Sequence, residues 1–276
     1  MSNDIIEKYL IYNNKTYSIE HIDKLDTKNS LSIYEVIRVI NGIPLFLEKH
    51  LERMQASARL LGRSIDAISG ALEGNIHKLI QINGSPNKNI RVVAYNLDKA
   101  EPDVVMYYIH SSYPTVGEYL NGVPATLYHA ERKNPNAKVV NQSFKDSVAK
   151  AMADTNTYEA LLVNENGLLT EGSRSNLFFI RGRKVYTAPG SMVLVGITRV
   201  CVFEACRRSG FEVIEEAVPS SALPECEAVF ISGTSPKVLP INSIDGKSYH
   251  SAANPIVMKI TKAYDQILQE YIASKK

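Results

Sequence analysis

Alternating apolar and polar positions dominate the first third of the chain and predict strands joined by tight turns. Tyr9–Tyr12 and Lys15–Ser18 flank Asn13-Asn14, which is typical of a hairpin turn. Ser32–Ile40 is rich in β-branched and aromatic residues, and Asn41-Gly42 directly after it is a type I′ turn signal. We therefore expect two hairpins at the start of the chain.

The pattern then changes to a helical period. Pro44–Leu47 begins the return strand of the second hairpin, and Glu48–Gly62 follows as a helix with one apolar face. A second helix is expected over Ile65–Asn83, before strands at Arg91–Tyr95 and Val104–Ile109. The apolar face of the first helix consists of Leu47, Leu51, Met54, Ala58 and Leu61.

Residues beyond Tyr113 again mix strands and helices. Tyr113–Asn121, which contains a proline and a glycine, indicates a linker. Helices are expected after Asn141, from Gly196 to about Gly210, and over Ile256–Tyr271. Strands are expected at Val123–His129, Ala160–Val163, Leu168–Arg181, Val185–Ala188, Phe211–Val218 and Ala228–Ser232. This order predicts an α+β fold of two domains: a smaller N-terminal domain over 1–117, a linker at 118–122 and a larger C-terminal domain over 123–276.

Composition excludes several classes of function. The chain has 276 residues, and its net charge is 31 − 29 = +2 with the basic residues scattered. Such a balance gives no electrostatic footprint for nucleic acid or for an anionic membrane. Cys201, Cys206 and Cys226 form no metal-binding spacing, so they are interpreted as reduced core residues and no metal is expected. No signal peptide or membrane helix is evident, and a cytoplasmic location is predicted.

The stretch LLTEGSRSNLFF at Leu168–Phe179 carries the strongest chemical signal. Glu171 lies inside an apolar, strand-like run, and a carboxylate there is costly to bury without a partner. Either it faces water or it meets a cation. A cationic cofactor ring is the more informative hypothesis, and a surface glutamate is the plain alternative.

Pyridoxal phosphate requires a lysine, an anion beside its pyridine nitrogen, and a phosphate cradle. Gly196-Ile197-Thr198 offers N–H groups and a hydroxyl at a helix N-terminus, and Gly233-Thr234-Ser235 offers a second set after a strand. Arg53 can make charge-assisted contacts with phosphate oxygens. Each signal alone is weak, because such a helix start is most often only a capped helix and such an arginine is more often a solvated one.

The ordered set of motifs resembles the fold-type IV pyridoxal-phosphate enzymes, which include branched-chain and D-amino-acid aminotransferases and aminodeoxychorismate lyases. The resemblance covers nearly the whole chain, from about Tyr34 to Gly246. Its motifs are Tyr34-Glu35-Val36 with Asn41-Gly42, His50-Leu51-Glu52-Arg53-Met54, Lys138 with Asn141, Tyr158-Glu159-Ala160, Thr170-Glu171-Gly172 with Asn176-Leu177-Phe178, Gly196-Ile197-Thr198-Arg199, Ser232-Gly233-Thr234, Pro240 and Asp245-Gly246.

The resemblance implies a role for each motif residue. Lys138 would bind the cofactor covalently and carry the proton, and Glu171 would pair with the pyridinium nitrogen. Tyr34 and Arg91 would lie on the substrate side, and Ser235 would help to hold the substrate carboxylate. The phosphate would be held by Arg53, Gly196, Ile197, Thr198 and Thr234. The cofactor would lie between the domains of a homodimeric enzyme.

Several alternatives stay open at this point. Lys145 and Lys133 rival Lys138 as the cofactor lysine; Lys138 is preferred because it precedes the expected helix. The favoured reaction is ping-pong transamination between a branched-chain L-amino acid and a 2-oxo acid such as 2-oxoglutarate. Aminodeoxychorismate lyase and D-amino-acid aminotransferase are the other activities considered. A non-enzymatic binding protein is a third class, suggested by Asp26–Ile33, which lacks the glycine-containing pattern usual in the family.

Overall fold

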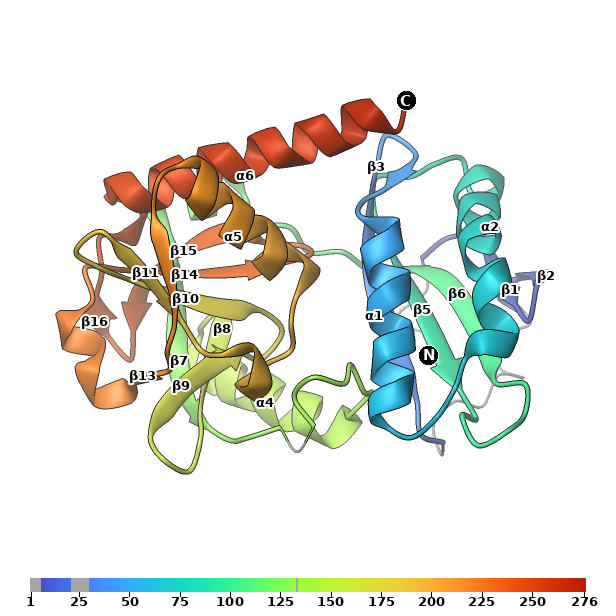
Figure 1. Cartoon of the computed structure of the whole chain (residues 1–276), viewed down its shortest axis with the longest axis horizontal. Helices are drawn as coiled ribbons and strands as arrows, with labels where there is room; N and C mark the ends of the chain where they lie inside the picture. Colours follow the sequence, from blue (N-terminus) through green and yellow to red (C-terminus); the bar gives the residue numbers. More distant parts are fainter. Residues whose placement is uncertain (1–5, 21–29, 133) are drawn as a thin grey trace. The chain divides into compact units, whose positions relative to one another are not determined.

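The computed structural model describes residues 6–20, 30–132 and 134–276. Their mutual contacts divide them into two units, both drawn in Figure 1. Unit 1 consists of the described residues up to Ser112, together with Ala137–Val140 and Tyr271–Lys276. Unit 2 consists of the described residues of Tyr113–Asn136 together with Asn141–Glu270. Lys133 and the first half of Asp26–Ile33, residues 26–29, lie outside the described residues.

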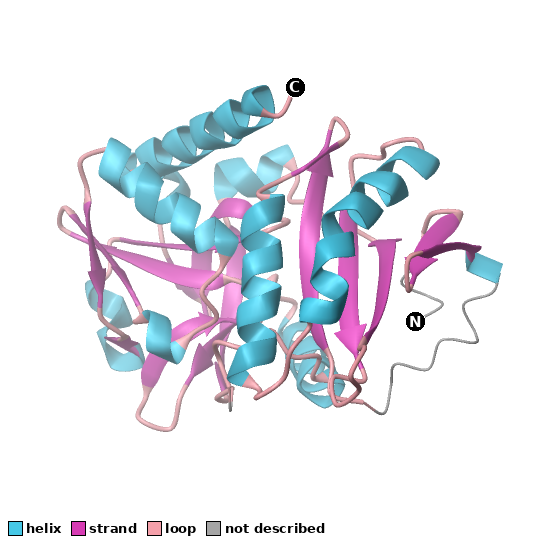
Figure 2. Cartoon of the chain, turned by 45° about the vertical axis from the view of Figure 1, so that its right-hand side comes forward, coloured by secondary structure: helices cyan, strands magenta, loops and turns pink. Residues whose placement is uncertain are grey.

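Unit 1 is an antiparallel sheet of six strands in the order β2-β1-β6-β5-β3-β4. Helices α1 (Leu47–Leu60) and α2 (Asp66–Ile82) cover one of its faces, as Figure 2 shows. The strands are β1 (Tyr9–Tyr12), β2 (Lys15–Ser18), β3 (Ile33–Ile40), β4 (Ile43–Pro44), β5 (Asn89–Tyr95) and β6 (Asp103–Ile109).

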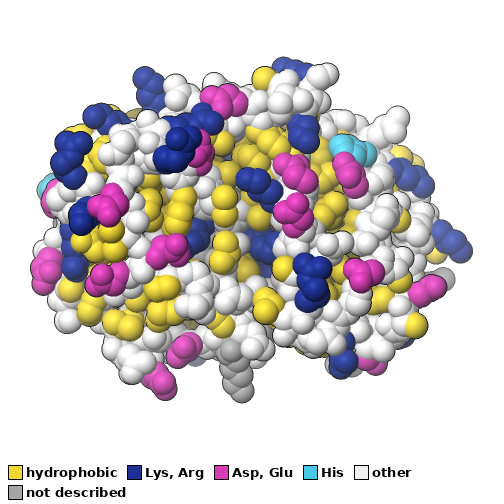
Figure 3. All heavy atoms as spheres, viewed as in Figure 1, with side chains coloured by type: hydrophobic (Ala, Val, Ile, Leu, Met, Phe, Trp, Pro, Cys, Tyr) yellow, Lys and Arg dark blue, Asp and Glu magenta, His cyan; other side chains and the backbone are white. Residues whose placement is uncertain are grey.

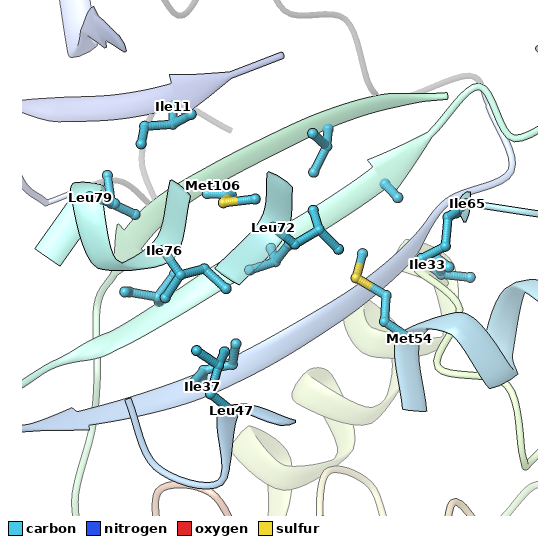
Figure 4. Close-up of a cluster of buried hydrophobic side chains, with 14 of the residues drawn as sticks. Ile11, Ile33, Ile37, Leu47, Met54, Ile65, Leu72, Ile76, Leu79 and Met106 are labelled. Atoms are coloured by element: carbon cyan, nitrogen blue, oxygen red, sulfur yellow. The ribbon is translucent and has the colours of Figure 1, made fainter. Parts of the chain in front are cut away.

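The core of unit 1 follows from the alternation predicted for β3. Its odd-numbered residues are buried, and Ile33 and Ile37 face Met54 and Leu47 of α1 in Figure 4. Side chains of α2 complete this layer, so the two helical apolar faces pack against one side of the sheet.

Both predicted hairpins are confirmed. Asn13-Asn14 joins β1 to β2 with positive φ at both residues, and Asn41-Gly42 has φ of 51° and 77°. The return strand β4 is shorter than expected. Phe46 adopts a left-handed conformation with φ of 51°, which ends the extended chain and lets α1 begin at Leu47.

Unit 2 is built around a ten-stranded sheet in which six strands form a closed, barrel-like ring. The order is β12-β11-β10-β14-β15-β7-β8-β9-β13, and β9 also pairs with β10 through Asn176 opposite Glu171. Strands β10, β14, β15, β7, β8 and β9 therefore form a closed circuit, and Glu171 lies at its seam. The strands are β7 (Val123–His129), β8 (Glu159–Val163), β9 (Leu168–Gly172), β10 (Asn176–Arg181), β11 (Lys184–Thr187), β12 (Glu212–Glu215), β13 (Val218–Pro219), β14 (Ala228–Gly233), β15 (Lys237–Ile244) and β16 (Lys247–Ser248).

The helices associated with unit 2 are α3 (Val116–Asn121), α4 (Gln142–Thr155), α5 (Ile197–Arg208) and α6 (Pro255–Ser274), whose last residues belong to unit 1. Of these, α4, α5 and α6 agree in place with the predictions. The side chain of Asn141 accepts a hydrogen bond from Phe144 N–H at 3.0 Å, which confirms the expected cap of α4.

Three expectations for unit 2 need correction. Leu168–Arg181 is two strands rather than one, because the chain turns at Ser173–Ser175. Part of the expected linker is helical, because Thr115 and Glu118 form a capping box that starts α3. The long strand β15 was not expected, since its polar residues and Pro240 interrupt the strand pattern.

The structure also places the cysteines and the charged side chains that the composition drew attention to. All three cysteines are buried and free, as expected. No helix among the described residues is long and apolar enough to cross a membrane, and no described group of three or more His, Cys, Asp or Glu residues is arranged to bind a metal. Basic and acidic side chains are interspersed on the face drawn in Figure 3, as a net charge of +2 implies.

Candidate active site

Lys138 is held against strand β3 in unit 1. Tyr34 N–H donates to Lys138 O at 3.0 Å, Val140 N–H donates to Ser32 O at 2.9 Å, and Ile33 bridges Val139. These contacts add Ala137–Val140 to the sheet beside the start of β3. The backbone of Lys138 is thereby fixed, and its Nζ lies 4.8 Å from the centre of the Tyr34 ring.

Tyr34 and Arg91 share one face of the same sheet. Tyr34 lies opposite Val93 and Val36 lies opposite Arg91, so Tyr34 and Arg91 are diagonal neighbours on strands β3 and β5. The Arg91 guanidinium carbon is 4.9 Å from the centre of the Tyr34 ring. Two cationic side chains therefore lie within reach of one aromatic ring, at the distance of a cation–π contact.

Arg53 projects from α1 onto a buried carboxylate. Its Nε donates to Glu35 Oε1 at 2.8 Å and its second guanidinium nitrogen donates to Glu35 Oε2 at 2.5 Å. His50 Nδ1 lies 2.7 Å from Glu35 Oε2. Burial alone would raise the pKa of Glu35, but the charge of Arg53 and the hydrogen bonds from Arg53 and His50 outweigh it and lower the pKa to about 2.

The rival lysines do not share this arrangement. Lys145 lies in the first turns of α4 in unit 2, where its N–H donates to Asn141 O at 3.2 Å. Lys133 lies outside the described residues. Of the described lysines that the sequence singles out, Lys138 is the one that lies in the same unit as Tyr34, Arg91 and Arg53.

Glu171 in unit 2 is buried and has two partners. Arg132 Nε lies 3.2 Å from Glu171 Oε1, and Leu194 N–H donates to Glu171 Oε2 at 3.2 Å. Only 3% of the residue is exposed. The sequence left open whether this carboxylate faces water or meets a cation, and among the described residues Arg132 is a cation that it meets. Sequence reasoning missed Arg132 because it lies in a polar stretch without periodicity.

Arg132 is itself held by the turn that follows Glu171. One of its guanidinium nitrogens donates to Ser173 O. Ser173 is fixed in turn by Glu159, whose Oε1 accepts from the Ser173 N–H at 3.1 Å and from its hydroxyl at 2.5 Å. The buried carboxylate of Glu159 therefore sets the turn, the turn places Arg132, and Arg132 faces Glu171.

The loop before α5 links Glu171 to the predicted phosphate cradle. Leu194 donates its N–H to Glu171, and its carbonyl accepts from Asn176 Nδ2 at 2.8 Å. A Cβ at Gly196 would collide with Asn176 Oδ1, so any larger residue there must displace the Asn176 side chain. Helix α5 begins one residue later, and the first-turn N–H groups of Ile197 and Thr198 can bind an anion.

Residues 32–244 match the family model of amino-transferase class IV. The chain belongs to this family. It is 30% identical over 255 residues to D-alanine aminotransferase from Bacillus licheniformis, with 88% of each chain covered. It is 26% identical over 260 residues to branched-chain-amino-acid aminotransferase from Salmonella typhimurium, covering 84% of this chain and 82% of the relative.

The solved structures agree on the fold. The T.th. branched-chain amino acid aminotransferase complexed with N-(5'-phosphopyridoxyl)-L-glutamate superimposes with a TM-score of 0.84. The two chains are 23% identical, and the match covers 97% of this chain and 96% of the other. This class IV aminotransferase therefore has the fold-type IV architecture and depends on pyridoxal phosphate.

The residues of this aminotransferase fit pyridoxal phosphate chemically. A buried carboxylate held by Arg132 and Leu194 suits a protonated pyridine ring. The Arg53 guanidinium in unit 1 and the N-terminal N–H groups of α5 in unit 2 are each chemically suited to a phosphate. The Ser232 hydroxyl is buried and has no hydrogen-bond partner among the described residues. It directly precedes Gly233-Thr234, which lies at the turn between β14 and β15. An oxygen-rich ligand at this turn would satisfy that hydroxyl.

Proposed function

We propose that Lys138 and Glu171 act on one pyridoxal phosphate in a ping-pong transamination. The observation that carries this proposal is the placement of Lys138 beside Tyr34, in the unit that also contains Arg53 and Arg91. When bound, the cofactor supplies an electron sink for the electrons released when a substrate C–H bond breaks. The chain must supply the proton carrier, the counter-ions and the substrate contacts.

Lys138 would act as the general base and acid. Its Nζ would take the proton from the substrate α-carbon and deliver it to the C4′ carbon of the cofactor. The Lys138 backbone is fixed to β3 and by the Ser57 hydroxyl, 3.2 Å from Lys138 N, and its Nζ lies 4.8 Å from the centre of the Tyr34 ring, which restricts where the side chain starts and what it packs on. Such restriction lowers the entropic cost of the proton transfer.

Glu171 would keep the pyridine nitrogen protonated. Leu194 N–H donates to one of its oxygens and the Arg132 guanidinium lies beside the other, so the carboxylate is held in one orientation. The phosphate would be held by Arg53, by Gly196, Ile197 and Thr198 at the start of α5, and by Thr234. These groups lie on rigid elements, which suits precise placement of the ring.

The substrate carboxylate would contact Arg91, Tyr34 and Ser235. We propose a branched-chain L-amino acid as the amino donor and 2-oxoglutarate as an acceptor. The Salmonella typhimurium relative, a branched-chain-amino-acid aminotransferase, supports the choice of a branched-chain amino acid. D-alanine is the second candidate donor, because the relative from Bacillus licheniformis is a D-alanine aminotransferase of 30% identity. The homodimer and the cytoplasmic location stay predictions.

An amino-exchange assay tests this proposal. The purified protein is incubated with L-leucine or D-alanine and 2-oxoglutarate, and the new amino acid is identified by chiral chromatography. L-leucine consumption with glutamate formation supports the first donor, and D-alanine consumption supports the second. Pyruvate release from aminodeoxychorismate without an oxo acid would identify a lyase instead, and no reaction with any substrate would contradict the enzymatic proposal.

The cofactor lysine is tested separately by reduction. Borohydride treatment of the yellow protein followed by peptide mapping should find the label on Lys138. A label on Lys145 or Lys133 would overturn the assignment of the lysine while leaving the family unchanged.

A further inference from the structure

Glu35 occupies a position where the sequence pattern calls for an aliphatic residue. It lies between Ile33 and Ile37 on the face of β3 that packs against α1, and it is completely buried. Figure 4 shows these two isoleucines pointing at Met54 and Leu47. An ionised carboxylate in such a layer costs several kcal/mol unless its oxygens are fully paired. Its presence therefore requires a reason beyond packing.

The partners of Glu35 supply that reason. Both carboxylate oxygens accept from Arg53, at 2.8 Å and 2.5 Å, and this two-point contact fixes the plane of the guanidinium as well as its position. His50 and Arg53 lie one helical turn apart on α1, so both reach the same carboxylate. The contact thus acts on the residue that we assign to the cofactor phosphate.

His50 completes the arrangement as a neutral donor. Burial lowers the pKa of His50, and the charges of Arg53 and Lys138 add to this effect against the opposing influence of Glu35. A neutral ring beside an ionised carboxylate must carry its proton on Nδ1, because the carboxylate can only accept. The Nδ1–H therefore points at Glu35 Oε2, 2.7 Å away, and holds the carboxylate in the orientation that Arg53 needs.

We propose that Glu35 is a positioning residue for phosphate recognition, and that His50 supports it. Glu35 does not touch the cofactor; it pre-orders the Arg53 guanidinium so that little side-chain freedom is lost when a phosphate binds. This inference rests on the proposed role of Arg53 as a phosphate ligand. The rival explanation is that the ion pair only anchors α1 to β3.

The two explanations differ in how they treat a cofactor without its phosphate. The test compares the dissociation constants of pyridoxal phosphate and pyridoxal, measured by spectroscopic titration of the full-length apoprotein. If Glu35 only anchors α1, its substitution weakens the binding of both ligands equally. If Glu35 positions Arg53, its substitution weakens the binding of pyridoxal phosphate alone. The readout is therefore the dissociation constant of pyridoxal divided by that of pyridoxal phosphate.

We expect Glu35→Gln to reduce the preference for pyridoxal phosphate over pyridoxal by about tenfold, the size typical of a charge-assisted hydrogen bond. Arg53→Gln should reduce it further, and adding Glu35→Gln to that variant should have no additional effect. The matched control is Glu52→Gln, an exposed carboxylate beside Arg53 on the same helix, which should leave the ratio unchanged.

Each outcome separates this inference from the proposed function. If Arg53→Gln leaves the ratio unchanged, the assignment of Arg53 to the phosphate fails. If Arg53→Gln lowers the ratio and Glu35→Gln does not, only the role of Glu35 is overturned. Tighter binding of pyridoxal phosphate by Glu35→Gln would also overturn it, since Glu35 would then act by neutralising Arg53. Should Glu35→Gln not fold, His50→Asn provides the same test with an expected reduction of about threefold.

Discussion

The two units position their functional groups by different means. In unit 1, side chains orient side chains: Glu35 holds Arg53, and the Tyr34 ring contacts Lys138 and Arg91. In unit 2 the backbone does most of this work. Leu194 N–H fixes Glu171, and the first turn of α5 presents its N–H groups behind Gly196.

This difference predicts how each half responds to mutation. A side-chain contact can be removed by one conservative substitution that leaves the backbone in place. A backbone contact can be changed only by moving the chain, which a glycine substitution does when a new Cβ has no room. Substitutions in unit 1 should therefore change binding or activity independently of stability. Substitutions in unit 2 should change binding and stability together.

The largest effect is expected for Lys138→Ala. Removing the proton carrier should lower kcat by about a thousandfold or more, the upper range of general acid–base catalysis. The half-reaction with L-leucine, followed by the absorbance of the cofactor, provides the measurement. Lys145→Ala is the control and should stay within about twofold of the parent. Loss of activity in that control with retention in Lys138→Ala would reverse the choice of lysine.

The second largest effect is expected for Glu171→Gln, which should reduce kcat by about a hundredfold at saturating cofactor. The amide has nearly the same shape but no charge, so it cannot keep the pyridine nitrogen protonated, and electrostatic groups of this kind contribute on that order. Steady-state kinetics with Glu165→Gln as control, an exposed carboxylate in the turn before β9, provides the comparison. An unchanged kcat would mean that Glu171 serves only to pair Arg132.

The sequence predicted the local parts of this fold and missed the long-range ones. The hairpins at Asn13-Asn14 and Asn41-Gly42 and the cap at Asn141 depend on neighbouring residues, so their patterns suffice. The break at Ser173–Ser175 depends on Glu159, a residue of another strand. The polar residues Ser173–Ser175 carry no sign of that contact by themselves, and one long strand was predicted over Leu168–Arg181 instead.

The same distinction holds for the site. Lys138, Glu171 and Arg53 were singled out because their residue types and order match a known set of motifs. Arg132 was not identified, because its role depends on meeting Glu171, and a charged residue in a polar stretch usually indicates solvent. Glu35 was quoted only as part of a motif, although its buried position on β3 follows from the alternation of Ser32–Ile40.

Gly196→Ala tests the backbone half of the comparison. The new Cβ would collide with Asn176 Oδ1, so the Asn176 side chain must move and its hydrogen bond to Leu194 O, in the loop before α5, would be disturbed. Overpacking of this kind costs about 1–3 kcal/mol, and we expect the dissociation constant of pyridoxal phosphate to rise about tenfold while that of pyridoxal rises as well. Thermal unfolding of the apoprotein should show a lower Tm.

Gly190→Ala is the matched control for that variant, since it lies in the same loop and its added Cβ would make only ordinary contacts. It should leave both dissociation constants unchanged. A Gly196→Ala protein with normal affinity and normal Tm would show that the loop is adjustable, and the contrast between the two units would disappear.

The smallest effect concerns pH and the buried side chains of unit 1. The pKa of His50 is lowered by burial, so the unfolded chain binds a proton there that the folded chain does not. Stability from this residue is therefore present above pH 6.5 and decreases as the pH falls below that value. His50→Asn keeps an amide donor near Nδ1 but cannot titrate.

The difference in unfolding free energy between the parent protein and His50→Asn should consequently narrow by about 1 kcal/mol between pH 8 and pH 5.5, because one proton contributes about 1.4 kcal/mol per pH unit. Urea denaturation at the two pH values measures it. His77→Asn, which removes an exposed histidine of α2, should show no such change. A constant difference for His50→Asn would mean that His50 has the same pKa in the folded and unfolded chains, which contradicts the effect of burial. A difference that widens as the pH falls would mean that His50 is protonated in the folded protein. The carboxylate of Glu35 would then be shared between two cations, and the neutral-donor arrangement that we assign to His50 would be wrong.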